Sequence, residues 1–346
     1  MSSVSSSAVP AAPSLRNPLS PLVYALVGVA ILGALLYGVF STGQAPDVLL
    51  NIFTTRFLGI FIEAVPFLLL GSLISGLIES YVRPDDLVRY LPRNPILSTL
   101  AGIFLGIVFP VCECGVVPVV RRLYMKGLPI SVGMTFLLAA PFMNPIVFAS
   151  TYIAFGFGPI FIGRFLITVV VAGAVGLIFA LTSKPKDVLQ SGVILQETGW
   201  ENMQPRRSFA AGLRSAMLTA ATEFFEMGRY LVLGCLLAAA LQTLVSQEAL
   251  LSIGRGPILS ALVMLVLAFL LSVCSTVDAF IALAFSVTFP TGSLLAFLSF
   301  GPMVDIKSTL MFRGIFKPRI VFYLVLLPFL MNWVIAALIN ITLGYY

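Results

Sequence analysis

The residues best suited to chemistry in this chain are an acid and two thiols set inside an apolar run. Glu113 lies between Cys112 and Cys114, within residues 109–115. A charged group at membrane depth costs roughly 2.5 to 3.5 kcal/mol on insertion scales, so such groups face protein or water and usually have a function. Thiolates select soft metals and metalloids, whereas a free cysteine also packs as a small hydrophobe. We therefore interpret the segment as half of a transport site and keep a packing role for the thiols as the alternative.

Matching polar residues recur along the rest of the chain. The candidates for substrate binding are Cys112, Cys114, Cys274, Asn144, Ser275 and Thr276. The candidates for ion or proton coupling are Glu113, Asp278, Asp305, Lys307, Glu63 and Glu226. Prolines interrupt the apolar runs at 141–145 and 301–305, and each such break frees backbone carbonyls that a substrate or ion can use. For every acid, the alternative to a role in coupling is a structural role. We place Glu63 and Glu226 near helix starts, where the helix dipole favours a carboxylate.

The composition is that of an integral membrane protein. Of 346 residues, 59% are hydrophobic and 10% are charged, against about 25% charged in soluble domains. Many apolar runs reach the roughly 20 residues that a transmembrane helix needs, and alternating strand patterns are absent. The absence of histidine excludes Ser-His-Asp catalysis and His-ligated zinc or haem. We expect no enzyme activity, no cofactor, no resident metal and no disulfide framework.

The basic residues orient the helices rather than bind a nucleic acid. The formal net charge is +6, and the lysines and arginines fall in short segments between apolar runs. The expected partners are therefore the lipid bilayer and a small-molecule or ion substrate, with no nucleic acid. The sequence leaves association into a homo-oligomer open.

Two halves of the chain resemble each other in sequence. Residues 63–71 resemble 226–234, residues 94–98 resemble 256–260, residues 110–114 resemble 272–276, and residues 136–144 resemble 297–305. The offset falls only from 163 residues (226 − 63) to 161 (302 − 141). Shared hydrophobic bias is the alternative, but four matched blocks in order argue against it. Internal repeats of this kind are typical of secondary transporters.

The positions of the basic residues favour a particular topology. Each repeat has four apolar segments, at 57–80, 95–120, 130–155 and 159–181 and at 215–244, 257–289, 293–312 and 319–343. If every segment crosses the membrane, lysine and arginine divide almost equally between the two sides. If the second segment of each repeat enters and leaves on one side, most basic residues become cytoplasmic, including Arg121, Arg122 and Lys126, and only Arg56, Arg164 and Arg255 lie outside. The positive-inside rule favours the second arrangement.

The predicted fold is an all-α polytopic membrane protein with two inverted repeats and an extra N-terminal transmembrane helix. Each repeat has three crossing helices and one re-entrant helical hairpin, because about 14 residues at 1.5 Å each reach about 20 Å into a 30 Å core. The N-terminus is then cytoplasmic. The predicted parts are a flexible tail at 1–20, the extra helix at 21–41, repeat 1 at 57–182, a cytoplasmic linker at 183–212 and repeat 2 at 213–343.

The motifs at the breaks resemble those of a known family. The segments 111–118 (Val-Cys-Glu-Cys-Gly-Val-Val-Pro), 140–145, 272–278 and 301–307 resemble the bacterial predicted-permease family, which includes the ArsP organoarsenical efflux permeases and YraQ-type membrane proteins. The resemblance covers about residues 57–330. It implies a multi-pass permease of the bacterial plasma (inner) membrane. In some members trivalent methylated or aromatic arsenicals are exported through cysteine thiols.

The leading hypothesis is a secondary transporter. We expect it to export a small thiol-reactive or anionic solute, such as a trivalent organoarsenical, by alternating access coupled to protons or ions. One alternative is a membrane-embedded thiol/quinone oxidoreductase that uses Cys112 and Cys114, although cysteines one residue apart form a strained disulfide. An ion channel is the other alternative.

Overall fold

The computed structural model describes residues 46–82, 94–109, 111–183, 185–190, 209–244, 254 and 256–342. This part of the chain is helical, and its one β-type pairing is an isolated bridge between Leu189 and Phe316. The prediction of an all-α fold is confirmed. The predicted tail, the extra N-terminal helix and most of the linker lie outside the described residues.

The helices form two series with the same order along the chain. The first series is α2 (Pro46–Tyr81), α4 (Pro95–Val108), α5 (Glu113–Met125), α6 (Ile130–Ala139), α7 (Pro145–Phe155) and α8 (Pro159–Thr182). After the short α9 (Pro185–Val188), the second series is α11 (Phe209–Leu244), α13 (Pro257–Leu271), α14 (Asp278–Phe285), α15 (Thr291–Phe300), α16 (Ile306–Phe312) and α17 (Pro318–Thr342). The first helix of each series, α2 or α11, has 36 residues.

The helix boundaries follow simple sequence signals. The helices α4, α7, α8 and α13 begin at a proline, a residue whose fixed φ and missing N–H suit the first helical position. The predicted starts of the long helices were too late: α2 begins at Pro46 rather than 57, and α11 at Phe209 rather than 215. Polar residues interrupt the apolar run there, but a helix that extends beyond the hydrocarbon core tolerates them.

Four of the described helices are long and apolar enough to cross a membrane. They are α2, α8, α11 and α17. The shorter apolar helices α4, α6, α7, α13 and α15 lie between them along the chain. Since a crossing needs about 20 residues, each of these shorter helices reaches only part of the way alone.

One end of the molecule is identified by contacts around α9. The Lys126 Nζ, just after α5, donates to the carbonyls of Glu79 and Val82 at the end of α2, at 3.0 and 2.8 Å. The Gln190 N–H, just after α9, donates to the Ile315 carbonyl before α17 at 2.9 Å. We call this the α9 end, and it gathers the ends of α2, α5 and α8 with the start of α17.

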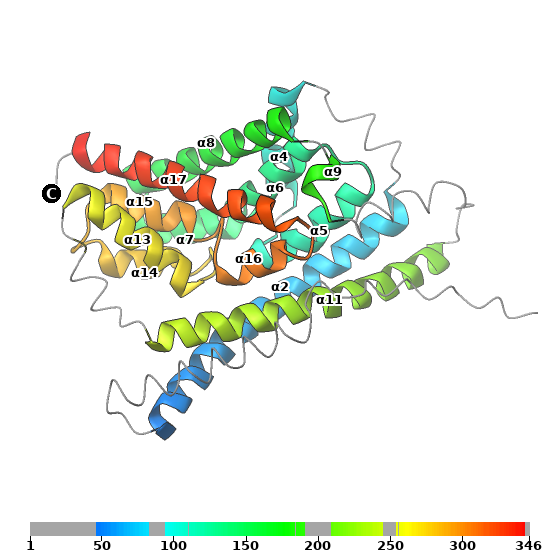
Figure 1. Ribbon diagram of the computed structural model, residues 1–346, viewed down its shortest axis with the longest axis horizontal. Helices are drawn as coiled ribbons and strands as arrows, with labels where there is room; N and C mark the ends of the chain where they lie inside the picture. Colours follow the sequence, from blue (N-terminus) through cyan, green and yellow to red (C-terminus); the bar gives the residue numbers. More distant parts are fainter. Residues whose placement is uncertain are drawn as a thin grey trace, which may run out of the picture.

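The opposite end holds the other termini of the long helices. There Arg56 of α2 donates to the Gln242 carbonyl near the end of α11. The side-chain amide of Asn340, near the end of α17, donates to the Pro257 carbonyl at the start of α13 at 2.8 Å. Figure 1 shows α2 and α8 running toward α9, and α11 and α17 running away from it.

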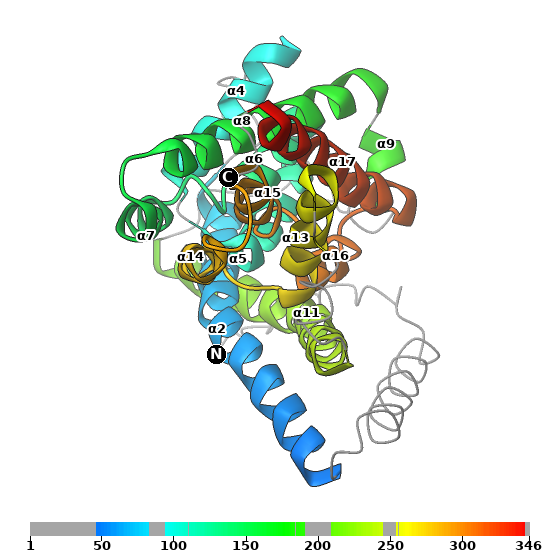
Figure 2. The same cartoon turned by 90° about the vertical axis from the view of Figure 1, so that its left-hand side faces the viewer.

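The core is built around α6 and α15, in which every residue except Thr291 is buried. The helix α6 packs between α4 and α8, and α15 packs between α13 and α17. The two 36-residue helices α2 and α11 cross each other beside this core, and the start of α2 extends beyond the bundle (Figure 2).

Two glycines at matching repeat positions allow close approach of the segments that carry charged residues. A Cβ on Gly71 of α2 would lie 2.3 Å from the Gly115 carbonyl oxygen in α5. A Cβ on Gly234 of α11 would lie 2.6 Å from the Lys307 Cα in α16. The offset between the glycines (234 − 71) equals the 163 residues found from sequence. These contacts fix how α5 and α16 lie against the long helices.

Adding a methyl group at Gly71 is expected to destabilise the protein. Gly71→Ala should lower the free energy of unfolding by about 1 to 3 kcal/mol, because the new Cβ overlaps the α5 backbone. The matched control is Gly59→Ala in the same helix, where a Cβ would meet no atom within 4 Å. Gly59→Ala should be neutral or stabilise by up to about 1 kcal/mol through helix propensity. Thermal unfolding of both purified variants measures the difference, and equal effects would contradict the close packing.

Candidate functional site

The breaks between the short helices carry most of the predicted site residues. The chain leaves helical structure after α4, α6, α13 and α15 and re-enters it at α5, α7, α14 and α16. Asn144 caps α7 by accepting a hydrogen bond from the Ile146 N–H at 3.0 Å. Asp305, its counterpart in the repeat, caps α16 by accepting from the Ser308 N–H at 2.6 Å, and Ser308 Oγ accepts from the Asp305 N–H. Both predicted site residues therefore have a structural role as helix caps.

A buried ammonium group joins the two halves of the chain. The Lys307 Nζ donates to the Ser272 carbonyl at 2.8 Å and lies 3.2 Å from Glu113 Oε1 and 3.3 Å from Asp305 Oδ2. The three side chains of Glu113, Asp305 and Lys307 are at most 3% exposed. Lys307 therefore does not extend to the membrane surface, and it pairs acids from α5 and from the start of α16. We call these four residues the Lys307 centre.

Ser272 completes the Lys307 centre with an unusual backbone. It is the one non-glycine residue with positive φ in the described part of the chain, at φ 52° and ψ 41°. Its Oγ donates to Asp305 Oδ2 at 2.7 Å, while its carbonyl accepts from Lys307. Left-handed backbone at a serine stores strain that surrounding contacts must hold, and such strain clusters at functional sites. Sequence reasoning missed Ser272, although it begins the segment that matches 110–114.

The charges of the Lys307 centre do not balance. Glu113 and Asp305 are two carboxylates against one ammonium, and all are shielded from water. Both Asp305 oxygens have hydrogen-bond donors, but Glu113 Oε2 is buried without a partner among the described residues. A buried oxygen without a hydrogen-bond partner is costly in free energy. A proton, water or ligand that bound this oxygen would therefore stabilise the site more than binding at the paired oxygens.

The three predicted cysteines lie in the segments that form the Lys307 centre. Cys112, Cys114 and Cys274 are buried and not in disulfides. Cys112 and Cys114 flank Glu113, and Cys274 follows Ser272 by two residues. In the described residues, no three His, Cys, Asp or Glu side chains are grouped so as to hold a metal ion.

A second buried ion pair ties the start of α14 to α8. Arg164 is 0% exposed, and its Nη2 lies 2.7 Å from Asp278 Oδ2. Its other contacts are the Thr151 hydroxyl at 2.9 Å, the Ser275 carbonyl at 3.4 Å and the Phe142 ring at 5.6 Å. From the sequence, Arg164 was counted as one of three basic residues outside the membrane and had no predicted site role, whereas its side chain is fully buried. It lies inside α8, and the signal that was overlooked is a single arginine followed by a long apolar run.

The remaining predicted residues contribute no side chain to these two centres. Thr276 is half-buried, and Ser275 takes part through its backbone carbonyl. Glu63 and Glu226 lie in the middle of α2 and α11, so their placement near helix starts is wrong, because both helices begin earlier than expected. Glu63 is half-buried, whereas Glu226 pairs with Arg121 at 2.5 Å.

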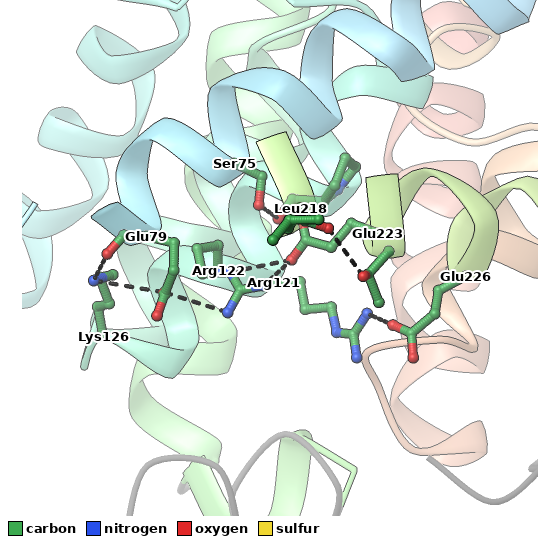
Figure 3. Close-up of polar contacts among 10 residues, drawn as sticks. Ser75, Glu79, Arg121, Arg122, Lys126, Leu218, Glu223 and Glu226 are labelled. Atoms are coloured by element: carbon green, nitrogen blue, oxygen red, sulfur yellow. Dashed lines mark hydrogen bonds and ion pairs between the residues drawn. The ribbon is translucent and has the colours of Figure 1, made fainter. Parts of the chain in front are cut away.

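Glu226 belongs to an ion-pair cluster toward the α9 end (Figure 3). The Arg122 side chain reaches Glu223 of α11 at 2.5 Å and Glu79 of α2 at 3.3 Å. The neighbouring Ser75 hydroxyl donates to the Pro118 carbonyl at 3.3 Å. Partial burial lowers the pKa of Lys126, and its Glu79 partner opposes this shift. The cluster joins the C-terminal half of α5 to both long helices. Its basic residues are therefore packed between helices rather than located in a loop.

The fold and the site together define a polytopic helical membrane protein with paired charges at its helix breaks. The chain belongs to the predicted permease family, whose model matches residues 49–341. The UPF0718 protein YcgR of Bacillus subtilis is 44% identical over 296 residues, which is 82% of this chain and 94% of that protein. A Streptococcus mutans protein named as a candidate subunit of a two-component membrane permease complex is 39% identical over 266 residues, 77% of this chain and 87% of that protein. No solved structure matches the chain.

Proposed function

We propose that this membrane permease is a secondary transporter that exports a small thiol-reactive or anionic solute. The Lys307 centre carries the proposal, because it places buried, unbalanced charge and free thiols where the two halves of the chain meet. Intramembrane ionisable residues that face the bundle interior mark substrate or ion pathways. Substrate binding beside the thiols and movement of a proton or ion at Glu113 would then be coupled through one site.

The proposed mechanism is alternating access by two inverted repeats. The matched long helices run in opposite directions, because the start of α2 contacts the end of α11 and α8 ends where α17 begins. The pair α4 and α5 begins and finishes near the α9 end, whereas α13 and α14 begin and finish near the opposite end, consistent with re-entrant hairpins from the two sides. Inverted repeats around a midplane site support alternating access.

The proposed orientation places the α9 end in the cytoplasm of a bacterial inner membrane. Basic residues near this end include Arg122, Lys126, Arg313, Lys317 and Arg319, and cytoplasmic loops are enriched in such residues. The N-terminus is cytoplasmic in this orientation.

Two engineered cysteines test the topology. Lys126→Cys, in the turn after α5, should react only with reagents added from the cytoplasmic side, and Thr288→Cys, in the exposed turn after α14, only from outside. The wild-type protein is the control, because its described cysteines are buried. Labelling of both variants from the same side would rule out hairpins that enter from opposite sides.

A transport assay tests the function. Everted membrane vesicles containing the protein should accumulate phenylarsenite, a trivalent aromatic arsenical, in a manner that an ionophore abolishes. Glu113→Gln and Asp305→Asn should each abolish most of this accumulation, because each removes an intramembrane acid that the proposed coupling needs. Asp187→Asn, at an exposed acid in α9, is the matched control and should keep full activity. Full activity of both site variants would remove these carboxyls from the mechanism.

A further inference from the structure

We propose that the ammonium of Lys307 occupies a monovalent-cation site, so that the protein carries a tethered cation where a sodium-coupled transporter would bind sodium. The inference rests on the proposed transport function and concerns the ion used at the same site. It predicts that neither stability nor transport of the wild-type protein depends on sodium.

The oxygens around Lys307 are of the kind that bind a sodium ion. They are the Ser272 carbonyl at 2.8 Å, Glu113 Oε1 at 3.2 Å and Asp305 Oδ2 at 3.3 Å. Backbone carbonyls at helix breaks and helix C-terminal ends coordinate sodium ions in secondary transporters. Ser272 supplies such a carbonyl directly after α13, and its left-handed conformation is held by its hydroxyl bond to Asp305. One ammonium thus donates to a carbonyl and forms ion pairs with two carboxylates from separate parts of the chain.

The ammonium is held in place by packing as well as by charge. Lys307 is 2% exposed, and its Cα lies where a Cβ on Gly234 would be 2.6 Å away. A lysine on the surface of a bundle extends to water, but this one is closed in by α11 and by the Lys307 centre. Its position is therefore fixed by the fold in the way that a bound ion is fixed by its ligands.

A metal ion has no adequate place beside the ammonium. Glu113 Oε2 is the carboxylate oxygen of the Lys307 centre that lacks a partner among the described residues. Metal ions bind several oxygens at once, and a single free oxygen does not supply them. Sodium would therefore have to displace the ammonium, which the tether prevents.

Removing the ammonium should create sodium binding. In Lys307→Ala, the two carboxylates and the Ser272 carbonyl face a space without a cation, so replacing choline chloride by sodium chloride at equal ionic strength should raise the melting temperature by about 5 °C or more. The wild-type protein should show no such difference. Lys126→Ala is the matched control, because Lys126 also binds carbonyls and an acid but lies near the α9 end within reach of water. It should gain no sodium dependence.

A double variant tests whether the Glu113 carboxylate is one of the sodium ligands. Adding Glu113→Gln to Lys307→Ala should abolish at least half of the sodium effect, because one charged ligand is lost. A wild-type protein stabilised by sodium relative to choline would overturn the proposal, and so would a Lys307→Ala protein that sodium does not stabilise or that cannot be purified even in sodium. The melting measurement uses no transport substrate. It can therefore contradict the cation-site proposal while the vesicle assay supports transport, and the vesicle assay can contradict transport while the melting measurement supports the cation site.

Discussion

Arg164→Met is expected to lower the free energy of unfolding by about 3 to 5 kcal/mol. The change removes the cation 2.7 Å from Asp278 and leaves that carboxylate buried, at 2% exposure, without its ion partner. The cost is dominated by the unpaired acid rather than by lost packing, because methionine retains most of the side-chain stem. Equilibrium unfolding of the purified protein in detergent micelles measures the loss.

A double variant separates charge from packing in this prediction. Arg164→Met with Asp278→Asn leaves no unpaired charge and should recover more than half of the lost stability, since a buried ion pair often exchanges for neutral groups at little cost. Arg313→Met, at an exposed arginine, is the matched control and should change stability by less than about 0.5 kcal/mol. If the double variant is no more stable than Arg164→Met, the ion pair does not explain the effect.

Asp305→Ala is expected to cause a loss of similar size, about 3 to 5 kcal/mol, because it removes two hydrogen bonds to a charged carboxylate. Asp305 accepts hydrogen bonds from the Ser308 N–H at 2.6 Å and the Ser272 hydroxyl at 2.7 Å, and it lies 3.3 Å from Lys307 Nζ. Its removal weakens the cap of α16, releases the strained Ser272 and leaves Lys307 with one carboxylate. The same unfolding measurement applies, and the variant should also be inactive in the vesicle assay.

The repeat provides a control at the matching position. Asn144→Ala removes the cap of α7, where Asn144 accepts from the Ile146 N–H at 3.0 Å but forms no ion pair. Loss of a cap alone costs about 1 kcal/mol. If Asn144→Ala is as damaging as Asp305→Ala, then capping explains both results and the charges of the Lys307 centre contribute little to stability.

The helix breaks were predictable because their signals are local. Proline at the start of an apolar run placed the starts of α4, α8 and α13 correctly, and the predicted break at 141–145 ends where α7 begins. The same signals identified Glu113, Asp305 and Lys307 as residues worth attention, and the structure brings these three together. Which residues meet across the two halves depends on packing, which the local signals do not contain.

The charged residues that were misplaced show where this reasoning fails. Arg164 was counted only as an orienting charge outside the membrane, yet it forms an ion pair with Asp278, which lies 114 residues away along the chain. Ser272 was not predicted as a site residue. Its place in the Lys307 centre depends on a left-handed backbone conformation, which the presence of a serine in the sequence does not indicate. In both cases the determining feature is a contact between distant segments.

The length of α2 and α11 has a consequence for the surrounding lipid. A helix of 36 residues is about 54 Å long, and even at a tilt of 40° it would extend about 41 Å along the membrane normal, beyond a hydrocarbon layer of about 30 Å. The first turns of α2 expose Asn51, Thr54 and Thr55, which suit the headgroup layer. Bilayer thickness should therefore influence how these two helices are tilted, and thin and thick membranes should not support the protein equally well.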